Sequence, residues 1–514
     1  MAKLMSASMM SAVPSDTHKA TLPLRRMCFK QGTPAGTISV RRGLLKSRHA
    51  WQTSRHNTGI VPFATPDGNA PKQSDSWLSE GKEGAKEAAA VTGGAVAAAA
   101  EAVAQKPKKP RLPYLDSLRF FLIAYIATGH FIAFAGPSPF VAKLFSQVNV
   151  MVGAFFVLSG YVAAYVATEL NEYKASPRIK PAVSYFIGRV AGYYPLYALV
   201  NLIFAPMFLW VDNMYNGPVK AAWHALVTFT LSQAWFPTSA ELWNAPTWFL
   251  SALTFAMLVL PYALPYIAEW RRVALRRALL VLTGISLLAK VAFTYDLGAW
   301  TIFEGITPAK LHPNVMLWNM QRFHPFYAVL EVLMGAVACR LVMTDNAEDE
   351  KSKPKPAAGS ALLPLAGMVG LMVARAAGWI SINDSIARGV IFIPLFTAFL
   401  VRLHRRAVSP PSAGSGPGLL ASVLSLKPLV YLGALSFPIY ILHGPLGQVF
   451  YKKVVATKLW GGVMSQVAGP WFFAVWWAII LVSAAIVNKF FIQNPAVQSW
   501  TKDTVKSLSN ALSK

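Results

Sequence analysis

Long apolar segments recur along the chain from about residue 117 onward, separated by short polar stretches. A helix of about 20 apolar residues crosses the hydrocarbon core of a bilayer, so we expect most of these segments to be transmembrane helices. The pattern therefore predicts an all-α, polytopic membrane helical bundle. The segments are 117–136, 148–168, 190–211, 222–236, 247–268, 278–296, 325–343, 361–380, 386–403, 428–451 and 471–492.

The basic loops decide how the short segment 222–236 is treated, because cytoplasmic loops are enriched in Lys and Arg. If this segment does not span, the basic loops near 271–277, 351–355 and 402–406 all fall on the side of the N-terminus. If it spans, they all move to the other side. We therefore expect about ten transmembrane helices with both termini in the cytoplasm. Lys452 and Lys453 are then the exception on the outer side.

The composition excludes a purely soluble protein. Hydrophobic residues make up 54% of the 514 residues and charged residues only 14%, whereas ordinary globular chains carry about 25% charged residues. The two cysteines, Cys28 and Cys339, are too few for a disulfide framework or a cysteine-rich metal site. Without an HExxH, CxxC or glycine-rich phosphate motif in the sequence, we expect no bound metal or cofactor.

The net charge of +26 is concentrated outside the apolar segments. Residues 1–66 contain one acidic residue, Asp16, among arginines and serines, which is typical of an organelle transit peptide; a disordered cytosolic tail is the alternative. An Ala/Gly/Lys-rich linker, 67–111, a membrane domain, 112–495, and a short polar C-terminal tail, 496–514, follow. The charge then reflects targeting and orientation, so we expect contact with the lipid bilayer and no nucleic-acid binding.

Two ionisable residues in the first segment are the main candidates for chemistry, since charges inside membrane helices are costly. Arg119 and His130 are 11 positions apart, which places both side chains on one helix face about 16 Å apart along the axis. A cation near the boundary and a deeper imidazole suit a long ligand. The alternative is that Arg119 extends to the head groups while His130 bonds a neighbouring helix.

Other polar residues near or within the apolar segments have two readings each. Ser159 offers a hydroxyl to a substrate or marks close helix packing. Arg189 binds an anion or anchors the topology. Glu331 pairs with an arginine such as Arg119, or orients a histidine. His443 contacts a substrate or is a satisfied core residue.

Together, the motifs resemble the acyltransferase 3 family of multi-span membrane proteins. The matching elements follow one another in the expected order between about residues 112 and 492. They are Leu115-Asp116-x2-Arg119-x10-His130, Phe155-Phe156-x2-Ser159-Gly160-Tyr161, Arg189 with Pro195, Trp248, Glu331 with Gly335, and Ser436-x3-Tyr440-x2-His443-x-Pro445.

The resemblance implies a ten-helix bundle that moves an acyl group, commonly acetyl, from acyl-CoA to a hydroxyl of a carbohydrate or lipid-linked acceptor. It implies that Arg119 and His130 are the essential pair, with His130 as general base and Arg119, together with Arg189, holding donor phosphates. Tyr440, in the closing motif, is a seventh candidate and is expected to bind substrate. The chain departs from the family pattern at Gly188 and Gly192, where further arginines are usual, and after Trp248, where no glutamate follows.

A proton-coupled transporter is the rival function, because buried Arg, His and Glu residues also serve carriers. It predicts two related half-bundles, and the sequence shows no internal repeat. We expect a multi-pass protein of a plastid membrane if residues 1–66 are a transit peptide, and otherwise of the endomembranes or plasma membrane.

Overall fold

A computed structural model of the chain describes residues 111–167, 182–297, 315–349, 359–408 and 418–512. The predicted transit segment 1–66, and the predicted linker except for residue 111, lie outside the described residues. In the described ranges all regular elements are helices and none is a strand.

The described residues form a succession of α-helices. Their bounds are α3 Pro113–Phe131, α4 Pro139–Phe145, α5 Val148–Ala167, α6 Ala182–Ala191, α7 Tyr194–Asn216, α8 Pro218–Phe229, α9 Trp248–Glu269, α10 Arg272–Leu297, α11 Val315–Phe323, α12 Pro325–Asp349, α13 Leu362–Ala377, α14 Asp384–Ile386, α15 Ile393–Val408, α16 Leu419–Leu424, α17 Lys427–Ala434, α18 Ser436–Tyr451, α19 Lys453–Trp460, α20 Met464–Val467, α21 Phe472–Val487 and α22 Pro495–Leu512. Two π-helical turns, η5 Ala387–Phe392 and η7 Asn488–Ile492, join α14 to α15 and continue α21.

Several of these helices are long and apolar enough to cross a bilayer: seven among the described residues, or eight if the bent pair α17–α18 is one span. The predicted polytopic, all-helical bundle is therefore confirmed. The predicted spans at 278–296 and 361–380 correspond to α10 and to the 16-residue α13, which are outside this set. The predicted non-spanning segment 222–236 overlaps the 12-residue α8, which is too short to span.

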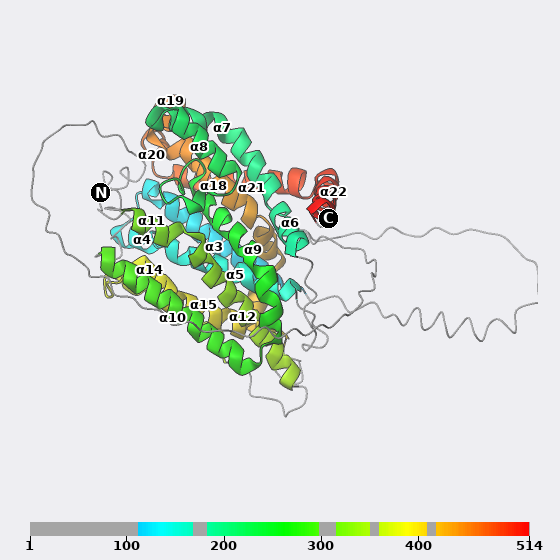
Figure 1. Cartoon of the computed structure of the whole chain (residues 1–514). Helices are drawn as coiled ribbons and strands as arrows, with labels where there is room; N and C mark the ends of the chain where they lie inside the picture. The colour runs from blue at the N-terminus through cyan, green and yellow to red at the C-terminus, as the bar shows by residue number, and fades with distance from the viewer. Residues whose placement is uncertain (1–110, 168–181, 298–314, 350–358, 409–417, 513–514) are drawn as a thin grey trace, which may run out of the picture.

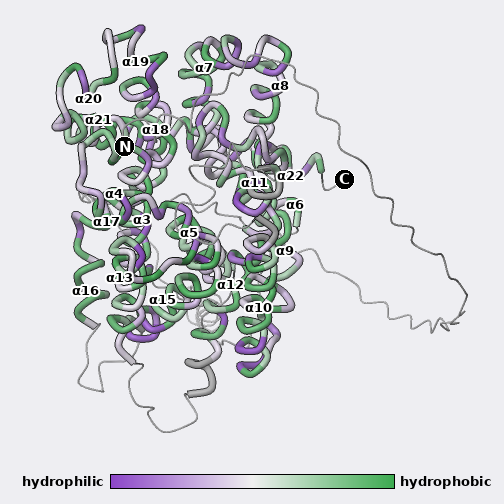
Figure 2. The backbone as a smooth tube through the Cα atoms, turned by 90° about the vertical axis from the view of Figure 1, so that its left-hand side faces the viewer, coloured by the Kyte–Doolittle hydropathy of each residue, from purple (hydrophilic) through white to green (hydrophobic). Residues whose placement is uncertain are grey.

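The helices lie side by side in one bundle (Figure 1). Helices α7, α8 and α19 gather at one end, and α10, α12 and α15 at the other. In both views α22 lies beside α6 at the edge of the bundle (Figures 1 and 2). Figure 2 shows α10 and α16 as mostly apolar along their length, as expected for helices that face lipid.

Helix α5 is packed most closely against α12. A Cβ on Gly160 would lie 1.8 Å from the Val332 carbonyl oxygen, and one on Gly335 would lie 1.9 Å from the Val157 carbonyl oxygen. No residue other than glycine allows the two backbones to approach this closely. In the Ser159-Gly160 motif, Gly160 is therefore the packing position, and Ser159 lies on a different face of α5.

A bend of 53° separates α17 from α18. Pro438 causes this break, because its ring clashes with the carbonyl four residues earlier, at Ala434, where α17 ends. The bend directs α18, with Tyr440 and His443, into the bundle.

Candidate active site

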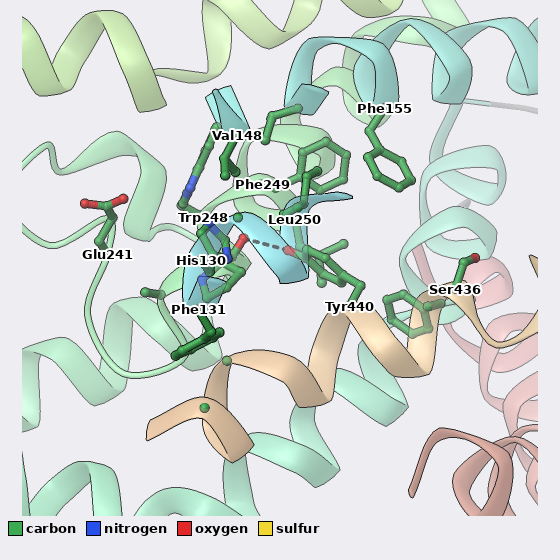
Figure 3. A pocket seen from close by; sticks show the side chains of 18 of the residues that line it. His130, Phe131, Val148, Phe155, Glu241, Trp248, Phe249, Leu250, Ser436 and Tyr440 are labelled. Atoms are coloured by element: carbon green, nitrogen blue, oxygen red, sulfur yellow. Dashed lines mark hydrogen bonds between the residues drawn. The ribbon is translucent and has the colours of Figure 1, made fainter. Parts of the chain in front are cut away.

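A cavity of about 1450 Å³ lies among α3, α5, α6, α7, α9, α18 and α22. Five of the seven residues selected from the sequence line it: Arg119, His130, Ser159, Arg189 and Tyr440. Figure 3 shows His130, Trp248 and Tyr440 around the same space, on three different helices. The cavity therefore brings together residues that are more than 300 positions apart in the sequence.

Arg119 and His130 both line this cavity from the single helix α3. The helix is continuous between them, so the 11-residue spacing places them about 16 Å apart along its axis. The Arg119 guanidinium donates to Asp116 at 2.6 Å, and Asp116 also accepts from Arg111 at 3.2 Å. A carboxylate one turn earlier thus fixes the position of the Arg119 side chain.

The imidazole of His130 contacts a second imidazole. His130 Nδ1 and His443 Nε2 are 3.1 Å apart. The ring planes differ by only 7°, and the centroids are 5.3 Å apart. The centroids are about two ring radii further apart than the nitrogens, so the rings meet edge to edge and the nitrogens point at each other. This is the geometry of a hydrogen bond.

The partners of His443 set the protonation of both rings. His443 Nδ1 lies 2.8 Å from the Tyr440 carbonyl oxygen and 3.2 Å from that of Ile439. Carbonyl oxygens only accept hydrogen bonds, so Nδ1 of His443 carries a proton and its Nε2, in the neutral ring, is an acceptor. His130 Nδ1 must then be the donor, which leaves Nε2 of His130 unprotonated.

The surroundings of the two rings differ. His443 is fully buried, whereas His130 is exposed to the open space of the cavity. A neutral imidazole with a free ring nitrogen, held by a buried hydrogen-bond chain, is suited to act as a general base. His443 is outside the cavity lining, so it acts on any ligand through His130.

Tyr440 and Ser159 occupy the cavity wall on α18 and α5. The Tyr440 hydroxyl donates to the Pro246 carbonyl oxygen at 2.8 Å, which ties α18 to the turn before α9. Ser159 lies on the face of α5 that lines the cavity, together with Asn149, Val152 and Phe155. Between the polar ends, the lining is mostly apolar, with residues such as Ile126, Leu196 and Met257.

The cavity also has cationic residues at both ends. Arg119 and Arg189 lie at the end formed by the start of α3 and by α6, where Arg189 lies over the Tyr185 ring at 5.2 Å. Lys452 and Lys453 line the other end, just after α18. Burial lowers the pKa of Lys452 below its ordinary value, against the opposing effect of Asp212.

Glu331 is the sequence candidate that the structure places elsewhere. The expected pairing of Glu331 with an arginine is confirmed, but the partner is Arg388; Arg119 pairs with Asp116 instead. Glu331 is completely buried and forms a two-point ion pair with Arg388, with the Arg388 Nε at 2.9 Å from Oε1. The Lys290 ammonium lies 3.7 Å from the same carboxylate.

The sequence analysis did not identify Arg388 as the ion-pair partner of Glu331. A signal was present, because Arg388 falls inside the apolar segment 386–403, where a charge requires a partner. Its guanidinium also donates to Asn149 at 2.8 Å and lies over the Phe156 ring at 5.7 Å. Asn149, which lines the cavity, thus joins the cluster to the cavity wall.

Comparison with known proteins identifies the family. A family model described as an acyltransferase domain, that of the acyltransferase 3 family, matches residues 112–488. No curated protein and no solved structure matches the chain. The match covers most of the chain and all seven candidate residues, and it favours an enzyme over the rival transporter. The protein therefore belongs to the acyltransferase 3 family and is a multi-pass membrane acyltransferase.

Proposed function

We propose that the protein transfers an acyl group, with acetyl as the expected one, from acyl-CoA to a hydroxyl of a carbohydrate or lipid-linked acceptor. The observation that carries this proposal is the hydrogen-bond chain from the Tyr440 carbonyl through His443 to His130. It leaves one unprotonated imidazole nitrogen on a residue that lines a large cavity. An acceptor hydroxyl needs such a base in order to attack a thioester.

The shape of the cavity supports a long donor. Arg119 and Arg189 lie at one end, and His130 lies about 16 Å along α3 from Arg119. In acyl-CoA the phosphates and the thioester are at opposite ends of the pantetheine arm. Phosphates at the two arginines would therefore bring the thioester toward His130, with the arm along the apolar wall.

The transfer step then follows from ordinary acyl chemistry. His130 Nε2 removes the hydroxyl proton as the acceptor oxygen bonds to the thioester carbonyl carbon, and His443 accepts the hydrogen bond of the resulting imidazolium. The tetrahedral intermediate collapses with cleavage of the carbon–sulfur bond. The coenzyme A thiolate leaves and takes up the proton, which gives the acyl ester, free coenzyme A and neutral His130.

The cellular setting belongs to the same proposal. In a plastid membrane, the basic loops lie on the stromal side, where the imported N-terminus arrives, so the arginine end of the cavity opens toward stromal acyl-CoA. A plastid membrane is the proposed location, and a fluorescent fusion of residues 1–66 tests it. Import of the fusion into plastids supports the assignment, whereas a diffuse cytosolic signal contradicts it.

The proposed activity is tested with the protein reconstituted in liposomes, radiolabelled acetyl-CoA and a lipid and glycan extract of its own membranes. We expect label in the extract, and about a 10³-fold lower rate for His130→Ala, because a general base contributes 10²–10⁴-fold. His324→Ala is the matched control, since His324 packs on Trp235 away from the cavity lining.

Two results would contradict the proposal separately. Equal rates for wild type and His130→Ala remove His130 as the base. No transfer from acetyl-CoA or from longer acyl-CoA thioesters, in protein that is folded by gel filtration, removes coenzyme A thioesters as donors.

A further inference from the structure

The C-terminal helix α22 contributes one face to the cavity. The sequence predicted only a short polar tail at 496–514, but residues Pro495–Leu512 form an 18-residue helix that packs against α6. Val497, Gln498, Thr501 and Lys502 line the cavity. Their spacing of one, three and one residues places them on one side of a helix. Helix α22 is thus a wall of the arginine end.

The side of α6 that faces α22 leaves space for a ligand beside Arg189. Gly188 and Gly192 line the cavity on either side of Arg189 along the chain. A Cβ on Gly188 would have nothing within 4 Å. The α6 surface around Arg189 is therefore open, and a ligand there meets α22 rather than further α6 side chains.

The charges at this end are not balanced by carboxylates. Arg119 is paired with Asp116, but its charge is close enough to that of Arg189 for the two to repel. Among the described residues, no carboxylate lies within 4 Å of the Arg189 or Lys502 cationic groups. Among the described residues, Asp116 is the one carboxylate in ion-pair contact with these three cations, so this end of the cavity attracts anions.

The polar neighbours of Lys502 on α22 are already engaged. The Thr501 hydroxyl donates to the Val497 carbonyl oxygen at 2.7 Å, and Gln498 Nε2 donates to that of Ile492 at 3.1 Å. Lys502 is exposed and has three ammonium protons to offer. On this face of α22, Lys502 is therefore the cationic group available to an anionic ligand.

We propose that Lys502 binds the phosphorylated nucleotide portion of the donor, together with Arg189 and Arg119, so that α22 forms part of the donor site. This inference rests on the proposed acyl-CoA donor and adds a binding residue outside the family's matched segment, which ends at residue 488. A lysine suits a phosphate as a mobile point charge, while the arginines supply directed hydrogen bonds.

The test is direct binding of coenzyme A to the full-length protein in uncharged detergent micelles, measured by isothermal titration calorimetry. We expect Lys502→Gln to raise the dissociation constant about 10-fold, as loss of one charged hydrogen bond to phosphate requires. Lys502→Arg keeps the charge and should stay within about threefold of wild type. Lys506→Gln is the matched control, because Lys506 is exposed on α22 and lies outside the cavity lining.

The outcomes separate this inference from the proposed function. If wild type and Lys502→Gln bind coenzyme A with the same affinity, the role of Lys502 is overturned, while the proposed acyl-CoA donor is still supported. A Lys506→Gln effect as large as that of Lys502→Gln also overturns it, because the effect is then one of general charge. No binding of coenzyme A by wild type contradicts the proposed donor itself.

Anionic lipid head groups share the phosphate chemistry of the nucleotide. The titration is therefore repeated in micelles that contain phosphatidylglycerol. If Lys502→Gln changes the effect of the lipid but not the affinity for coenzyme A in uncharged micelles, the site is a lipid site and the nucleotide assignment is overturned.

Discussion

Helix α5 separates two groups of ionisable side chains that the sequence presents in the same way. On one side, Glu331, Arg388 and Lys290 are buried together, and the two cations share the one carboxylate. On the other side, His130 and Arg189 line an open cavity. The two faces alternate along α5, with Phe156 under the Arg388 guanidinium and Phe155 on the cavity wall.

The difference shows what distinguishes a structural charge from a reactive one. The Glu331 carboxylate is completely buried and is bound by Arg388 and Lys290, so a ligand has no access to it. His130 has one nitrogen bonded to His443 and one facing the cavity. Both groups lie within apolar segments of the sequence, but only His130 keeps a hydrogen-bonding atom that faces open space.

The largest expected effect is a loss of stability when the buried cluster of Glu331, Arg388 and Lys290 is changed. Glu331→Gln leaves Arg388 and Lys290 without a compensating charge, and breaking a buried ion pair in this way costs about 3–5 kcal/mol. We expect a much lower thermal unfolding temperature in detergent, followed by intrinsic tryptophan fluorescence. The acyl-transfer rate per folded molecule should remain close to that of wild type.

Glu241→Gln provides the comparison for that change. Glu241 pairs with Arg322 at 3.2 Å, but its side chain is 47% exposed, and exposed pairs contribute about 0–1 kcal/mol. Equal losses of stability in the two variants would show that the Glu331 cluster is not sealed from solvent.

The next effect concerns His443, which we regard as a positioning residue. His443→Ala removes the acceptor of the His130 Nδ1 proton, and loss of such an orienting partner costs about 10–100-fold in related imidazole sites. We expect kcat to fall by this factor while KM for the donor stays constant. His443→Gln retains a side-chain acceptor and should recover part of the rate.

A purely structural role for His443 gives a different result. In that case, His443→Ala lowers the unfolding temperature and the yield of folded protein, but the folded fraction turns over at the wild-type rate. Gel filtration before the assay separates the two explanations.

Arg189→Gln tests the open end of the cavity. Arg189 has no carboxylate partner among the described residues, so its removal leaves no buried charge uncompensated. We expect KM for acyl-CoA to rise about 10-fold, from loss of a charged hydrogen bond to phosphate, with an unchanged unfolding temperature. A loss of stability without a change in KM would identify Arg189 as a topology anchor instead.

Ser159→Ala should have the smallest effect. Ser159 is on the cavity face of α5, and one neutral hydrogen bond contributes about 0.5–1.5 kcal/mol. We expect kcat/KM to fall by about two- to tenfold if the hydroxyl contacts a substrate. Full activity in Ser159→Ala would remove it from the binding site, since the packing position is its neighbour Gly160.

Helix periodicity and segment length were sufficient to predict most of the fold. The apolar segments coincide with α3, α5, α7, α9, α12, α15, α18 and α21. Helix α22 was missed because its average hydropathy is that of a polar tail, and only its packing on α6 stabilises it as a helix in this position. The bend between α17 and α18 was not predicted, because segment 428–451 was treated as one span; Pro438 is the sequence signal for it.

The site was predictable only where one helix contains it. Arg119 and His130 share a face because they are on α3, and the 3.6-residue repeat fixes that relation. The contact of His130 with His443 joins positions 313 residues apart, and no local pattern specifies it. Which arginine pairs with Glu331 was not predictable for the same reason, because Arg388 lies on a π-helical turn of a distant segment.

The interlocked glycines of α5 and α12 have a consequence for how substrates reach the cavity. Backbones in direct contact slide only if both helices separate, so we expect the α5–α12 side to behave as a fixed frame during turnover. Gate motions would then occur across the cavity, in α6, α7 and α22. Spin labels on α22 and α5 should report a distance that changes with donor, while a label pair on α5 and α12 should not.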